Sequence, residues 1–79
     1  MEESMSYNAN DPNQNAYWDE ELAGRLDGIA QELYGQAEEA QNLGFSREEA
    51  IYRNVYRAVL EAARALRDEA AYLRAQPSA

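Results

Sequence analysis

The chain has 79 residues and a net charge of −8, and it contains no cysteine, histidine or lysine. This length supports one domain, and a domain so small buries only about 60% of its unfolded surface, so a further source of stabilisation is expected. Disulfides and thiolate ligands are excluded, which leaves association with another chain. The commonest general bases and nucleophiles are missing, so we expect no enzyme activity and no cofactor. The adjacent Glu38 and Glu39 are interpreted as solvated acids rather than a metal site.

The charge is unevenly distributed along the chain. Residues 1–43 hold ten acids and one base, whereas residues 44–79 hold five acids and six arginines. An acidic chain repels nucleic-acid phosphates and anionic membrane surfaces, so we expect neither as a partner. It is attracted to basic protein surfaces. The first residues are acidic and no apolar run approaches the roughly 20 residues of a membrane span, which predicts a cytoplasmic protein.

Residues 1–15 are polar and lack an apolar period, which predicts a flexible arm or an arm that becomes ordered on a partner. The first helix begins between Asp11 and Asp19, with Asp11-Pro12 or Asn15 as its cap, and we place it at residues 16–43. Its apolar residues follow steps of four and three, typical of a heptad repeat. They are Leu22, Leu26, Ile29, Leu33, Ala40 and Leu43, with Gln36 in register and Ala16, Ala23, Ala30 and Ala37 beside them.

Three glycines, Gly24, Gly28 and Gly35, lie opposite the leucines of this helix. They are tolerated on a solvent face, form a second contact strip, or mark a local kink. Gly44-Phe45 is the predicted turn, because glycine favours the left-handed angles that end a helix.

The second helix is predicted over residues 46–75, opened by a capping box between Ser46 and Glu49 and closed before Pro77. Residues 77–79 form a short tail. The heptad positions of this helix are Tyr52, Val55, Val59, Ala62, Leu66 and Leu73, with Glu69 in the same register. Its opposite side carries Arg53, Arg57, Leu60, Arg64 and Arg67, which are either a solvated face or a second interface with another chain.

Together these patterns predict an all-α fold: an antiparallel helical hairpin over residues 16–76, preceded by the flexible arm. The apolar faces are wider than one hairpin can cover. We therefore expect a homodimer that closes a four-helix bundle, or completion of the fold on a different partner. The core and dimer seam would comprise Leu22, Leu26, Ile29, Leu33, Tyr52, Val55, Val59, Leu66 and Leu73.

Two functions fit this architecture. The first is a small acidic inhibitor that occupies the basic, nucleic-acid-binding surface of a larger machine. In size and charge the chain resembles anti-CRISPR and other phage anti-defence proteins, and this resemblance implies that acidic side chains imitate phosphates. They would be Asp19, Glu20, Glu21, Asp27, Glu38 and Glu39. The second is a structural or adaptor protein whose hairpin mediates dimerisation or assembly.

Overall fold

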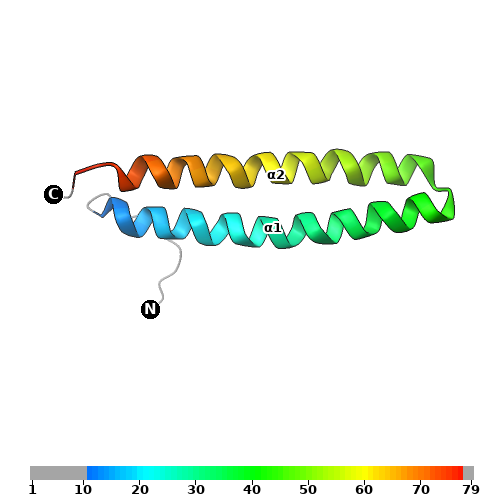
Figure 1. Ribbon diagram of the computed structural model, residues 1–79, viewed down its shortest axis with the longest axis horizontal. Coiled ribbons are helices and arrows are strands. Elements are labelled where there is room, and N and C mark those ends of the chain that lie inside the picture. The colour runs from blue at the N-terminus through cyan, green and yellow to red at the C-terminus, as the bar shows by residue number, and fades with distance from the viewer. Residues whose placement is uncertain (1–10, 78–79) are drawn as a thin grey trace.

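The computed structural model describes residues 11–77, and within them the chain forms two α-helices and no strand. Helix α1 spans Pro12–Leu43 and helix α2 spans Ser46–Arg74. The two helices lie side by side along their length, with the turn at one end and the start of α1 and end of α2 at the other (Figure 1). The predicted all-α hairpin is confirmed. Residues 1–10 of the predicted arm and residues 78–79 of the predicted tail lie outside the described residues.

Helix α1 begins at Pro12, with the first of the two predicted caps, and so four residues before its predicted placement at residue 16. The Asp11 carboxylate accepts a hydrogen bond from the backbone N–H of Gln14 at 3.1 Å, and Pro12 occupies the first turn. Aspartate as N-cap followed by proline is a favoured helix start, because the cap satisfies an otherwise unpaired donor and proline needs none. Residues 12–15 are therefore helical, and their assignment to the arm was wrong.

The turn follows the prediction closely. Gly44 has a φ of 79°, the left-handed conformation that a side chain would strain, and α1 ends immediately before it. The N–H of Gly44 donates to the Gln41 carbonyl at 3.1 Å and the N–H of Phe45 donates to the Ala40 carbonyl at 2.9 Å. These bonds satisfy two of the last carbonyls of α1.

Helix α2 starts at Ser46 as predicted, but the capping box does not form. No side chain makes a capping bond at this end, and the N–H of Glu49 donates instead to the Phe45 carbonyl at 2.9 Å. The Glu49 carboxylate accepts from Arg53 one turn later. The helix ends at Arg74, one residue before the predicted end.

Alanine, rather than leucine, forms the line of contact between the helices. The fully buried apolar residues are Ala16, Ala23, Ala30, Ala37 and Ala40 on α1 and Ala63 and Ala70 on α2. The heptad pattern puts Ala16, Ala23, Ala30 and Ala37 beside the apolar line of α1 and Ala40 on it, and all five are buried in the contact. Methyl side chains allow two backbones to approach closely, and the larger side chains then splay to either side. The seam itself buries little apolar surface.

Candidate functional site

The two sides of the alanine seam have opposite character. In an antiparallel pair, the residues that follow the seam on both helices form one edge, and those that precede it form the other. We call the first the polar edge. On α1 it holds the residues that follow Asp19, Leu26, Leu33 and Ala40, and on α2 it holds those that follow the half-buried Tyr52, Val59, Leu66 and Leu73. They are Glu20, Asp27, Tyr34 and Gln41 on α1, and Arg53, Leu60, Arg67 and Arg74 on α2.

Cross-helix ion pairs hold the polar edge together. Arg74 binds both carboxylate oxygens of Glu20, with Nη2–Oε1 at 2.7 Å and Nε–Oε2 at 3.2 Å. Arg67 pairs in the same way with Asp27, whose nearer oxygen lies 2.5 Å from Nη2. Hydrogen bonding to these arginines lowers the pKa of Glu20 and of Asp27 below their usual values.

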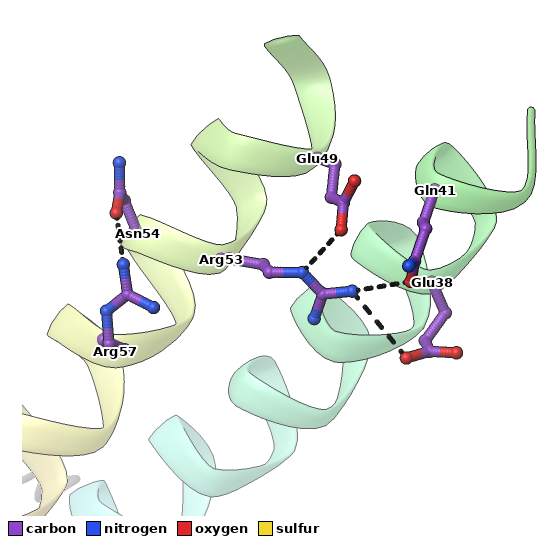
Figure 2. A network of polar contacts seen from close by, with 6 residues as sticks. All are labelled: Glu38, Gln41, Glu49, Arg53, Asn54 and Arg57. Atoms are coloured by element: carbon purple, nitrogen blue, oxygen red, sulfur yellow. Dashed lines mark hydrogen bonds and ion pairs between the residues drawn. The ribbon is translucent and has the colours of Figure 1, made fainter. Parts of the chain in front are cut away.

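Arg53 is the centre of a larger cluster near the turn (Figure 2). Its Nε donates to Glu49 at 2.8 Å on the same helix, while its Nη2 donates to Gln41 at 3.0 Å and lies 3.8 Å from Glu38 on α1. The hydrogen bond to Glu49 is the main reason that the pKa of Arg53 is raised. This one guanidinium therefore ties both helices together beside the turn.

The other edge is apolar and uncovered. We call it the open face. It comprises the apolar side chains, half-buried or exposed, that lie on this side of the line of contact between the helices. They are Leu22, Leu26, Ile29, Leu33 and Leu43 on α1, and Ile51, Tyr52, Val55, Val59 and Leu66 on α2. Ile29 is 45% exposed and Val55 is 42% exposed, although both are β-branched apolar residues within helices.

Grooves connect residues along the open face. One is lined by Ile29 and Leu33 together with Glu32 and Gln36 on α1. A second, at the turn, crosses from Leu43 on α1 to Tyr52 on α2 and is also lined by Glu39 and Glu48. The uncovered surface therefore runs from the middle of α1 to the turn and includes both helices. Exposed apolar side chains bordered by polar ones are typical of a protein interaction site.

The predicted seam residues divide between these environments. Leu22, Leu26, Leu33, Tyr52, Val59, Leu66 and Leu73 are half-buried along the hairpin, whereas Ile29 and Val55 are exposed. No single helix face could bury all of them against one neighbour, because the apolar surface of each helix is broader than the alanine seam. The leucine pattern thus marks the open face as much as the core.

The six acids predicted to form one binding face occupy different surroundings. Glu20, Asp27 and Glu38 lie beside arginines of their own hairpin. Asp19 is buried in the seam. Glu21 is exposed on the outer side of α1, Glu39 is exposed beside the groove at the turn, and no ion pair is formed by either among residues 11–77. The acids therefore do not gather into a continuous patch.

The predicted arginine strip lies partly on the polar edge. Arg53 and Arg67 face α1, and Leu60 lies between them with 38% of its surface exposed. Arg57 donates to Asn54 at 2.5 Å on its own helix (Figure 2), and Arg64 is exposed. Two arginines of the strip thus meet acids on the other helix of the same chain, a pairing that the two predicted alternatives did not include.

Asp19 is the residue that sequence reasoning placed least well. Its side chain is fully buried, and neither carboxylate oxygen has a hydrogen-bond partner in the described part of the chain. Burial, with a smaller contribution from nearby Glu69, raises the pKa of Asp19. The signal was present in the sequence, because Asp19 lies three residues after Ala16 and four before Ala23, which places it in the alanine seam.

Residues 11–77 contain no group of three or more carboxylates, cysteines or histidines arranged to hold a metal ion. No helix in this range combines the length and apolar character needed to cross a membrane. No family model matches the chain, and neither a curated protein nor a solved structure is significantly similar to it. The interaction surfaces are therefore the features from which a function can be argued.

Proposed function

We propose that the protein is a non-enzymatic structural or adaptor module that assembles with another helical polypeptide through its open face. The observation that carries this proposal is the exposure of Ile29 and Val55 on an apolar surface that extends over both helices. Burial of apolar surface is worth about 25 cal/mol per Å², so covering this face is the largest stabilisation still available to the hairpin.

The contrast between the two edges supports the same proposal. The polar edge already has its partners, since Glu20, Asp27 and Glu38 lie against arginines of the same chain. A basic surface that binds these acids would have to displace the arginines that already pair with them and fix the register of the two helices. Covering the open face would break none of these ion pairs.

Site-specific photo-crosslinking tests the proposal. The photoreactive residue p-benzoylphenylalanine replaces Ile29 in one variant and Leu60 in a matched control, since both positions are exposed apolar sites on opposite edges. We expect irradiation of the purified chain, alone and in extract from its source cells, to give covalent polypeptide adducts from position 29 and few from position 60. No adduct at position 29, or equal yields at both positions, would contradict the proposal.

The acidic inhibitor is the second candidate function. The observation that favours it is the exposure of Glu21 and Glu39, without arginine partners in residues 11–77, on a chain of net charge −8. Glu21→Gln separates the candidates, because Glu21 lies away from the open face, whereas Glu39 lines its groove at the turn and is left unchanged. An inhibitor that imitates phosphates would lose binding to a basic partner and would bind more weakly as salt rises. An adaptor that uses the open face would be unaffected.

A further inference from the structure

We propose that the polypeptide that covers the open face is a second copy of this chain, with the two turns at the same end of a four-helix bundle. This inference rests on the proposed function and specifies its partner. The two-fold axis would run parallel to the helices, so that α1 of each copy lies against α2 of the other. Every neighbouring pair of helices is then antiparallel, the arrangement that also favours the helix dipoles.

The first argument is charge complementarity. Arg25 lies on the border of the open face, three residues after Leu22 and four before Ile29. Glu69 lies on α2 at the heptad position of Val55, directly before the buried Ala70, and so lies within the open face. Both side chains are exposed, and neither makes a hydrogen bond or an ion pair among the described residues. One is basic and one is acidic, and they lie on different helices, so a second copy can bring them together.

The second argument is register. Within the hairpin, the residue numbers of Glu20 and Arg74 add up to the same sum as those of Asp27 and Arg67, and both pairs are in contact. Residues of α1 and α2 whose numbers add up to this sum therefore lie at the same position along the axis of the hairpin. The numbers of Arg25 and Glu69 add up to that sum too. A two-fold axis along the helices keeps this position unchanged, so Arg25 would face the partner subunit's Glu69. The opposite orientation, with turns at opposite ends, would not align them in this way.

The third argument is side-chain size. At the same register Ile29 would face the partner subunit's Ala65, and Gln36 would face the partner subunit's Ala58. Larger residues of α1 thus oppose alanines of α2 in the middle of the bundle, whereas toward its ends Leu22 would face the partner subunit's Tyr72 and Leu43 the partner subunit's Ile51. The middle of the bundle repeats the relationship seen inside the hairpin, where small residues allow close approach. The side of α2 that carries Ala58 and Ala65 therefore suits a second close helix contact.

Sedimentation equilibrium of the purified full chain, with charge-reversed variants, tests the inference. We expect a dimer, and we expect Arg25→Glu and Glu69→Arg each to raise its dissociation constant by about tenfold or more, because two symmetric contacts become repulsive. The double variant should return to within about threefold of the unchanged protein, since it restores opposite charges at the same positions. Glu61→Arg, on the exposed outer side of α2, is the matched control and should leave the constant unchanged.

A second readout separates this pairing from an effect on the hairpin itself. Glu69→Arg places a base near Asp19, so the variant hairpin should melt at a higher temperature at dilute, monomeric concentration while it dimerises less well. A purely structural role for Glu69 would move both quantities in the same direction, and that result would overturn the inference.

Two further results would overturn the inference. A chain that stays monomeric, while position 29 crosslinks to a different polypeptide, would refute the homodimer and leave the proposed adaptor function intact. A dimer in which the double variant fails to recover would refute the orientation with both turns at one end. Crosslinks from position 29 that map to the partner's residues around Ala65 would support it.

Discussion

The guanidinium of Arg74 binds both carboxylate oxygens of Glu20, a residue that lies 54 positions earlier in the chain, and so joins the last turn of α2 to the first turns of α1. The Arg67–Asp27 pair repeats this contact farther along the hairpin. All four side chains are more than 40% exposed, so solvent screens the pairs strongly. Their value lies in fixing the register of the two helices more than in adding stability.

The polar edge predicts a dependence of stability on pH. The pKa of Glu20 is lowered from an ordinary value of 4.5, and that of Asp27 from 3.8, by the arginine partners. The stabilisation is therefore present above these ordinary values and is lost as the pH falls through the lowered ones. Chemical denaturation between pH 7 and pH 2 should show this loss, and a Glu20→Gln, Asp27→Asn double variant should show a flatter profile. Identical profiles would contradict the prediction.

Asp19 predicts a change of stability with pH in the opposite direction. Because burial raises its pKa above 3.8, ionisation disfavours the folded state, and stability should fall as the pH rises above that value. Asp19→Asn should stabilise the hairpin at pH 7, because it removes the charge that burial disfavours and leaves a neutral side chain of nearly the same size. Thermal melts should show that the gain disappears below pH 3.8. Glu21→Asn, an exposed acid two residues away, is the control.

The alanine seam predicts a strict limit on side-chain size. Ala30 is 2% exposed at the centre of the hairpin, so Ala30→Leu should force the helices apart and destabilise the fold by about 1–3 kcal/mol. Gln31→Leu adds a similar side chain on the exposed neighbouring position and should have little effect. Urea denaturation of both variants measures the difference. Equal effects would show that the seam is not closely packed.

The glycines of α1 predict a simple stabilisation. A Cβ added at Gly28 or Gly35 would have no atom within 4 Å, so alanine fits without strain. Each substitution should stabilise the helix by about 1 kcal/mol, because glycine loses more backbone freedom on folding than alanine. Gly44→Ala should destabilise it, since Gly44 has a φ of 79°. Differential scanning calorimetry distinguishes these outcomes.

The turn and the helical content could be predicted from sequence because their signals are local. Gly44 supplies the left-handed angle, and both helices lack proline beyond their first turn. The sequence left two possible starts for α1, because Asp11 and Asn15 are both good caps and the choice between them depends on how the first turn packs. The Ser46 capping box failed because Arg53 offers the Glu49 carboxylate a stronger, charged donor.

The sequence could not decide which apolar stripe of α1 meets α2. Ala23, Leu26 and Leu22 represent three adjacent stripes, and a face of that width is compatible with contact on either side. The structure places α2 over the alanines, and this choice follows from how closely the backbones can approach rather than from hydrophobicity. The cross-helix arginine pairs depend on the same choice, so the pattern of arginines on α2 alone did not predict them.

The narrow spine of methyl groups has a consequence for how this molecule behaves when diluted. Each buried methyl or methylene group contributes only about 0.8 kcal/mol, so a lone hairpin gains little cohesion from Ala23, Ala30 and Ala63. Because a second copy is proposed to cover the open face, the midpoint of thermal unfolding should rise with protein concentration, as it does for a fold stabilised by association.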